Sequence, residues 1–222
     1  MTRPAERGRV TPRALATRAA SRGRRYPRPS LVVALTLCCL IPSPLAAQGN
    51  TERYDDTFRK YSKRYFGVGF DWRLFKAQGM TESNLDSAAT SWAGARGIMQ
   101  LMPSTFAQIS SHHPEWDAID RVEWNIAAGI SHGRSLWRLW RDSVDTEDHS
   151  VFMFASYNAG RGTILRAQET ARLRDLDPRR WSSVEVVAAE VRRWRHQETL
   201  NYVRRIEANF ARMDPRGKVV RK

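Results

Sequence analysis

The sequence predicts an all-α protein with a single folded domain. Apolar and aromatic side chains recur every three or four residues over several segments, which is the spacing of one face of a helix. The clearest case is residues 122–140, where Ile126, Ile130 and Trp140 follow this rhythm. Alternating polar and apolar residues, the pattern of a half-buried strand, do not extend over a convincing length. With 222 residues, 41% of them hydrophobic, the chain can bury one core.

Two helices are expected near the start of this domain. Residues 51–65 carry aromatic side chains at helical spacing, and Gly67 and Gly69 then break the pattern. Asp71 is a suitable N-cap for a second helix that runs toward Glu82. Glu82 then lies near the C-terminus of the helix, where the helix dipole and burial both favour the neutral acid and raise its pKa.

The rest of the chain continues the helical pattern after a loop. Residues 86–97 are rich in Ala, Ser, Thr and Gly and are expected to form that loop. Further helices are expected to open at Pro103 and to cover residues 122–140, 148–157 and 198–213. The arginine-rich stretch 171–194 has no readable pattern.

The N-terminal 47 residues read as an export signal with a long basic leader. They carry nine arginines and one glutamate, followed by an apolar run from Leu31 to Leu45 and by Ala46-Ala47. Cleavage is expected after Ala47, which leaves residues 48–222 as the working domain with a core at about 70–213. The run is shorter than the ~20 residues of a membrane-spanning helix. An uncleaved segment would instead tether the chain to a membrane.

Charge and composition exclude several classes of function. Without the leader the chain keeps 28 of its 37 Lys and Arg and 22 of its 23 Asp and Glu, a net charge near +6. The basic residues are dispersed rather than interleaved with aromatic ones, which disfavours nucleic acid as a partner. Both cysteines lie in the leader, and the five histidines lack the spacing of metal ligands. We expect neither a metal nor a cofactor.

The most informative segment is residues 82–105, where Glu82-Ser83 precede Ser91, Gly94, Gly97 and the run Ile98–Thr105. It places one carboxylate beside a small-residue turn and an uncharged polar cluster, surroundings that favour a protonated acid. Three more blocks follow it, at residues 125–129, 155–160 and 198–206. Together the four blocks resemble, in order, the catalytic core of lytic transglycosylases of the soluble type, which are relatives of goose-type lysozyme. The resemblance covers roughly residues 71–210.

This resemblance implies a lysozyme-like fold and an exported enzyme, in the periplasm or cell envelope, that acts on peptidoglycan glycan strands. Glu82 would protonate the oxygen between N-acetylmuramic acid and N-acetylglucosamine while the substrate's own N-acetyl group attacks the sugar carbon. The resulting carboxylate would then activate the C6 hydroxyl, which closes a 1,6-anhydromuramic acid ring. No water is consumed and no second protein carboxylate is required.

The resemblance also assigns substrate-binding residues, each of which has a structural alternative. They are Ser91 and Gln100 for the sugar and its N-acetyl group, Met102 for the subsite wall, Tyr157 for the intermediate, Asn158 for local backbone, and Glu198 and Tyr202 as a supporting carboxylate and ring. In the alternatives the polar members serve only turns or helix ends, and Met102 and Tyr157 belong to the core. Among the tryptophans, Trp92 is the best candidate for sugar stacking.

The sequence departs from the family pattern at two points. Gly79 stands where an apolar residue is usual, and we expect it to loosen its helix, since glycine costs about 1 kcal/mol there. His132-Gly133-Arg134 replaces a usual Tyr-Leu pair, which predicts altered subsites.

Two other functions remain open from the sequence. A lysozyme of the same fold would use water, held by further acidic residues for which Asp86 and Asp117 are the candidates. A scaffold that binds the wall without cleaving it would keep the fold alone. Protein partners, and cleavage from strand ends or internally, are not indicated by the sequence.

Overall fold

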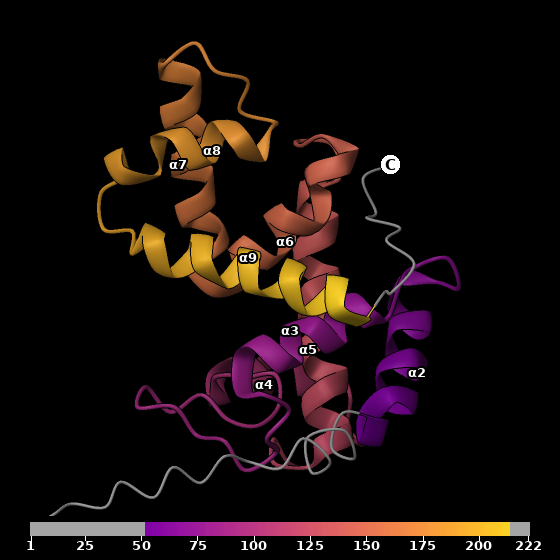
Figure 1. Ribbon diagram of the computed structural model, residues 1–222. Coiled ribbons are helices and arrows are strands. Elements are labelled where there is room, and N and C mark those ends of the chain that lie inside the picture. Colours follow the sequence, from indigo (N-terminus) through magenta and orange to yellow (C-terminus); the bar gives the residue numbers. More distant parts are fainter. Residues whose placement is uncertain (1–51, 214–222) are drawn as a thin grey trace, which may run out of the picture. The chain divides into compact units, whose positions relative to one another are not determined.

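Helices make up most of residues 52–213, the part of the chain that the computed structural model describes (Figure 1). Their bounds are η1 Glu52–Tyr54, α2 Asp55–Phe66, α3 Arg73–Ser83, α4 Pro103–Ser110, α5 Val122–Trp140, η2 Thr146–Asp148, α6 His149–Ala159, α7 Arg161–Leu173, α8 Trp181–Val187, η3 Ala188–Glu190 and α9 His196–Met213. Within this range the only strand-like pairings are the isolated bridges of Arg96 with Thr90 and Leu101. The all-α prediction is confirmed.

The leader and its cleavage site at Ala47 lie outside these residues. No helix between residues 52 and 213 is long and apolar enough to cross a membrane.

The core is organised around α5 and α9. Helix α5 packs against α2 and α6, while α9 packs along α3 and also contacts α6. In Figure 1, α9 crosses the domain, with α6, α7 and α8 on one side and α3, α4 and α5 on the other. Phe58, Phe75, Ile126 and Phe152 are fully buried where these helices meet. Because α9 contacts both sides, its residues can join groups that are far apart in the sequence.

The N-cap position of helix α3 is Trp72, one residue after the expected Asp71, and the helix ends one residue after Glu82. Asp71 Oδ1 accepts the Arg73 amide at 3.0 Å, although the residue in the N-cap position is Trp72. After Ser83 the chain turns sharply, with Asn84 and Leu85 both left-handed at φ 55° and 62°. Glu82 therefore occupies the last turn of a rigid helix, as predicted.

Gly79 has a different role from the one expected. A Cβ atom at this position would lie 3.1 Å from the side chains of Ile98, Leu85 and Phe58. The absence of a side chain thus lets the loop after α3 and helix α2 pack tightly against α3. The structure thus gives Gly79 a packing role that the sequence did not indicate.

The stretch 171–194, which has no readable pattern in the sequence, contains the end of α7 and all of α8 and η3. Helix α7 buries Ile164 and Ala171, and α8 buries Trp181 and Val184. The connection between the two helices is held by Gln168, whose Nε2 donates to the carbonyls of Pro178 at 2.8 Å and Ser143 at 3.3 Å. These elements form one side of the molecule above α9 in Figure 1.

Candidate active site

Glu82 is held by a short chain of buried polar groups. The Tyr202 hydroxyl on α9 donates to Glu82 Oε1 at 2.6 Å, and Gln78 Nε2 donates to the same hydroxyl at 3.0 Å. Tyr202 and Gln78 are both buried, whereas Glu82 keeps some exposure. Because the single hydroxyl proton of Tyr202 is donated to Glu82, the Tyr202 oxygen can only accept from Gln78. The Gln78 side-chain amide is therefore oriented with Nε2 toward Tyr202, and Gln78 Oε1 has no partner.

The surroundings of Glu82 favour its neutral form. Burial raises the pKa of Glu82 to about 7, against the lowering effects of the Tyr202 hydrogen bond, the Arg205 charge and Gln78. Burial also raises the pKa of Tyr202 well above its usual value, so this hydroxyl keeps its proton. With Oε1 accepting from Tyr202, the acidic proton of neutral Glu82 belongs on Oε2, the oxygen that Tyr202 leaves free. Burial, rather than the helix dipole, is the largest cause of the raised pKa of Glu82.

Tyr157 lies close enough to sense the charge of Glu82. Burial first, and then the Glu82 charge, raises the pKa of Tyr157 well above its usual value. Its hydroxyl donates to the Met99 carbonyl at 2.9 Å, which ties α6 to the loop after Gly97. His132 meets the Tyr157 ring edge-on at 5.1 Å between ring centroids, and burial lowers the His132 pKa, so the imidazole is neutral at pH 7. The sequence departure at residue 132 thus falls beside a candidate site residue.

Ser91 and Gln100 hold the loop between α3 and α4 together. Ser91 Oγ accepts the Ala95 amide at 2.9 Å, and Gln100 Nε2 donates to the carbonyls of Gly97 at 2.9 Å and Ala89 at 3.3 Å. Both side chains keep partial exposure. These hydrogen bonds are structural, and what remains for a ligand is the hydroxyl hydrogen of Ser91 as a donor and Gln100 Oε1 as an acceptor.

A buried asparagine anchors the same loop from α5. Asn125 Oδ1 accepts the Met99 amide at 2.8 Å, while its Nδ2 donates to the carbonyls of Arg96 at 2.9 Å and Ile119 at 3.1 Å. Gly97, at φ 74°, leaves room for this side chain, because a Cβ there would come within 2.5 Å of Asn125 Nδ2. The loop is thus fixed to the core by its backbone.

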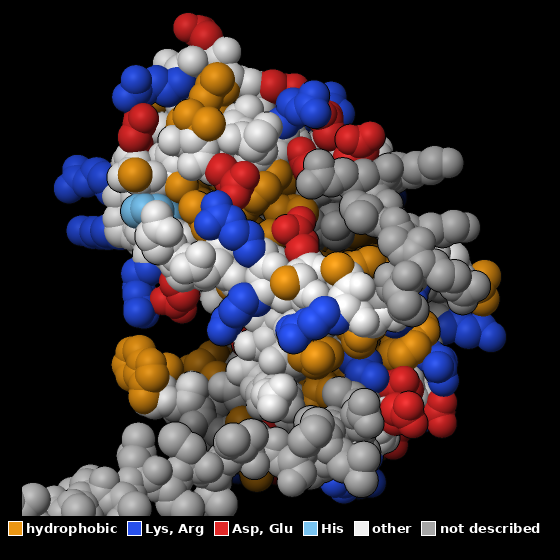
Figure 2. All heavy atoms as spheres, viewed as in Figure 1, with side chains coloured by type: hydrophobic (Ala, Val, Ile, Leu, Met, Phe, Trp, Pro, Cys, Tyr) orange, Lys and Arg blue, Asp and Glu red, His pale blue; other side chains and the backbone are white. Residues whose placement is uncertain are grey.

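Two apolar side chains of this region face solvent. Trp92 is 93% exposed and Met102 is 41% exposed, so neither belongs to the core. In Figure 2 the molecule is notched on one side, and hydrophobic side chains stand at one edge of the notch. The side chains of Trp92 and Met102 are therefore both accessible to a ligand.

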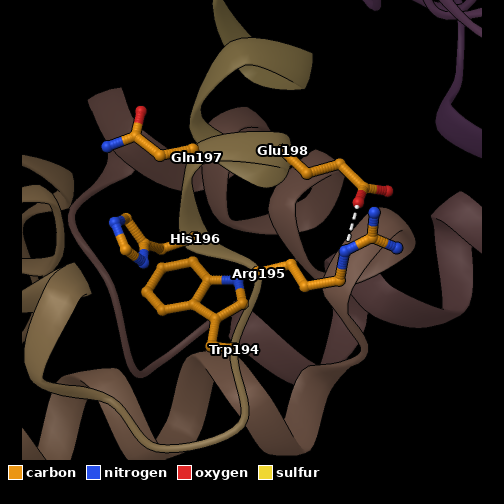
Figure 3. Close-up of a pocket in the computed structure, with 5 residues that line it drawn as sticks. All are labelled: Trp194, Arg195, His196, Gln197 and Glu198. Carbon is orange, nitrogen blue, oxygen red and sulfur yellow. Dashed lines mark ion pairs between the residues drawn. The ribbon is translucent and has the colours of Figure 1, made fainter.

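Asn158 and Glu198 come together at a place that Glu82 does not line. They line a hollow of about 230 Å³ with Ala159, Thr163, Arg193, Trp194, Arg195 and Thr199. Asn158 Oδ1 accepts from Thr199 Oγ1 at 2.8 Å, and Glu198 pairs with Arg195 at 3.1 Å. A second hollow of about 330 Å³ adjoins it and is lined by residues 194–198, with the rings of Trp194 and His196 side by side and Arg195 directed at Glu198 (Figure 3).

The acidic residues considered for a hydrolase have local partners. Asp86 Oδ1 accepts the Ala88 amide at 2.9 Å, and Asp117 pairs with Arg121 at 3.1 Å. No carboxylate of residues 52–213 is among the groups that shift the pKa of Glu82. The same range contains no cluster of His, Cys, Asp and Glu that would hold a metal ion.

Sequence reasoning missed several residues of this site. Gln78 precedes Glu82 by one helical turn and was detectable, because side chains four residues apart share a helix face. Asn125, Thr199 and His132 fall in segments already noted in the sequence, but their contacts join distant segments, which no local pattern indicates. Tyr202, expected to face the cleft as a ring, is instead buried and acts through its hydroxyl group.

The all-α fold, with the partly buried Glu82 at the end of α3, is that of a lysozyme-like helical domain. In structure the chain is similar to the 70 kDa soluble lytic transglycosylase SLT70 of Escherichia coli, with a TM-score of 0.55 at 23% identity over 71% of this chain and 23% of that one. The model of the Transglycosylase SLT domain matches residues 56–177. The chain belongs to this family.

Curated relatives agree with this assignment. The chain is 34% identical to a membrane-bound lytic murein transglycosylase F of Desulfosudis oleivorans over 63% of its own length, and 29% identical to one of Stutzerimonas stutzeri over 71%. The matched parts are 30% and 31% of those relatives, so the chain spans about a third of their length.

Proposed function

We propose that the chain is a lytic transglycosylase that cleaves peptidoglycan between N-acetylmuramic acid and N-acetylglucosamine, with Glu82 as general acid and then general base. The observation that carries this proposal is the partly buried Glu82, whose pKa is raised to about 7 and whose Oε1 accepts from Tyr202. An acid whose pKa lies near the working pH is suited both to give and to take a proton. Family membership supports the substrate class.

In the first step the Glu82 Oε2 proton passes to the glycosidic oxygen as the bond from that oxygen to C1 of the muramic acid breaks. The carbonyl oxygen of the substrate's own N-acetyl group forms a new bond to C1, giving an oxazolinium ion. The absence of carboxylates among the described groups that act on Glu82 supports a mechanism in which the substrate supplies this nucleophile.

In the second step the Glu82 carboxylate takes the proton of the C6 hydroxyl, whose oxygen attacks C1 and expels the N-acetyl oxygen. The product ends in 1,6-anhydromuramic acid, and Glu82 is again protonated. Tyr202 donates to Oε1 throughout and stabilises the carboxylate between the steps. Tyr157, whose proton is used on Met99, would orient the intermediate near the C6 hydroxyl.

For the substrate-binding residues we propose two groups. Ser91 and Gln100 would contact the sugar and its N-acetyl group, Ser91 as a hydroxyl donor and Gln100 through its Oε1 acceptor, and Met102 would form an apolar wall. Asn158 and Glu198 would contact a more distant part of the strand, because they line the hollow beside the active centre.

We also propose that the chain works in the periplasm or cell envelope. The leader predicted at residues 1–47 and the membrane-bound relatives support export. In this proposal residues 48–222 form the exported catalytic domain.

The test is digestion of purified peptidoglycan, with the products identified by mass spectrometry. Anhydromuramic ends, lighter by one water than reducing ends, are expected from the wild type, and Glu82→Gln should abolish them while the protein stays folded. Reducing ends would show a lysozyme instead. Binding without cleavage would favour the scaffold, and full activity of a folded Glu82→Gln variant would refute the role of Glu82.

A further inference from the structure

The hollow that Asn158 and Glu198 share has three hydrogen-bond donors without an acceptor among residues 52–213, on Arg193, Asn158 and Thr163. Arg193, an exposed residue of the lining, has a guanidinium group that forms no hydrogen bond or ion pair within residues 52–213, and its backbone is left-handed at φ 59°. An uncommitted arginine in the wall of a hollow, on a constrained backbone, is positioned to meet a ligand.

A hydrogen-bond relay determines which end of Asn158 is available. Trp194 Nε1 donates to Thr199 Oγ1 at 2.9 Å, so the Thr199 proton goes to Asn158 Oδ1 at 2.8 Å. Indole nitrogen can only donate, so the direction of the relay is fixed. Asn158 therefore keeps its Nδ2 amide, which has two further hydrogens, for the hollow.

The other polar groups of the lining do not offset this excess of donors. Thr163 Oγ1 accepts from Arg166 at 3.2 Å, which leaves its own hydrogen free to donate. Glu198 is the one carboxylate in the wall, and its charge is matched by Arg195 at 3.1 Å. The net charge of the lining is thus set by Arg193.

The hollow lies close to the catalytic groups along α9. Glu198 precedes Tyr202 by four residues, a rise of about 6 Å. Asn158 directly follows Tyr157, the residue that senses the Glu82 charge. Two extended amino acid residues span about 7 Å, so a short peptide on a sugar bound at Glu82 would reach the hollow.

We infer that this hollow is a carboxylate-binding subsite, in which Arg193 and Asn158 bind a free carboxylate of the peptide carried by the muramic acid. The inference rests on the proposed function, which supplies the peptide-bearing substrate. A guanidinium group binds a carboxylate through two parallel hydrogen bonds, and an amide adds a third. The subsite would favour strands that carry acidic peptides over bare or amidated ones.

The test compares two soluble probes with the full chain by calorimetry. One is the disaccharide N-acetylglucosaminyl-N-acetylmuramic acid bearing its tetrapeptide, and the other is the same compound with its peptide carboxylates amidated. The variants are Arg193→Asn, because asparagine tolerates a left-handed backbone, and Arg192→Asn as a matched control. Arg192 is an exposed neighbour that does not line the hollow.

We expect the wild type and Arg192→Asn to bind the acidic probe roughly 10-fold more tightly than the amidated one, and Arg193→Asn to lose this preference. Three results would overturn the subsite. They are a preference for the acidic probe that persists in Arg193→Asn, one that Arg192→Asn loses to the same extent, and no preference in the wild type. Formation of anhydromuramic ends is scored separately. A preference for the acidic probe without cleavage would support the subsite and refute the proposed function. Cleavage without that preference would support the proposed function and refute the subsite.

Discussion

The two sides of the candidate site are built in different ways. On one side, the loop at residues 84–101 follows Glu82, carries the recognisable motif, and spends many of its polar groups on its own backbone and on Asn125. On the other side, Arg193 lies in the stretch 171–194, which has no readable pattern, and has no partner within residues 52–213, while Asn158 in the block 155–160 keeps its Nδ2 for the hollow. The comparison teaches that a strong sequence motif can mark rigidity, while free binding groups can lie where no motif is visible.

The largest effect is expected where the first side is anchored. Asn125→Ala removes hydrogen bonds to Met99, Arg96 and Ile119 and leaves buried backbone groups unpaired, which should lower the free energy of unfolding by about 3–5 kcal/mol. Urea denaturation measures this loss. The exposed Asn201→Ala is the control and should change it by less than about 0.5 kcal/mol. Equal effects of the two substitutions would mean that the loop does not depend on Asn125.

The next prediction concerns the acid between the two sides. The pKa of Glu82 rises from 4.5 in the unfolded chain to about 7 when folded, so the folded state loses stability as the pH rises from 4.5 to 7. Glu82→Gln has no such loss. Its stability relative to the wild type should therefore increase over this window by up to about 3 kcal/mol and stay constant below it.

Thermal unfolding at pH 4, 6 and 8 measures this difference. The control is Glu198→Gln, which removes an exposed ion pair with Arg195 worth less than about 1 kcal/mol. If the difference in stability between Glu82→Gln and the wild type does not grow as the pH rises, burial in the folded protein does not raise the pKa of Glu82.

A smaller effect is expected from the anchor of the second side. Gln168→Ala removes two hydrogen bonds, to Pro178 and Ser143, at a partly exposed connection, and should cost about 1–3 kcal/mol in unfolding free energy. Gln108→Ala on the exposed face of α4 is its control. A loss as large as that of Asn125→Ala would remove the contrast between a firmly and a weakly anchored side.

The smallest effect on stability is expected at Trp92. Because its side chain is 93% exposed, Trp92→Ala should change the free energy of unfolding by less than about 0.5 kcal/mol. Urea denaturation is again the measurement. A loss above 1 kcal/mol would show that the indole ring packs against the loop and is not available to a ligand.

Local signals explain which parts of the fold were predictable. The bounds of α5, the opening of α4 at Pro103, and the place of Glu82 at the end of α3 all follow from short-range rules of periodicity and proline geometry. Helices α7 and α8 were missed because arginines and the break at Pro178 obscure their apolar faces, which are narrow.

The candidate site was predictable only in part, for the same reason. The sequence singled out Glu82, and the four-residue rule could have added Gln78. The hydrogen bond from Tyr202 joins residues 120 positions apart, and it depends on α9 packing along α3. Periodicity describes one helix at a time, so it cannot show which helices meet.

The same packing of α9 on α3 has a consequence for how this domain can be cut and transplanted. The family match ends at residue 177, but the hydroxyl group that holds Glu82 comes from residue 202. A fragment trimmed to the match would keep the acid and lose its partner, along with the wall that α9 gives to α3. Any chimera or shortened version that is meant to retain chemistry must therefore carry the chain through Met213.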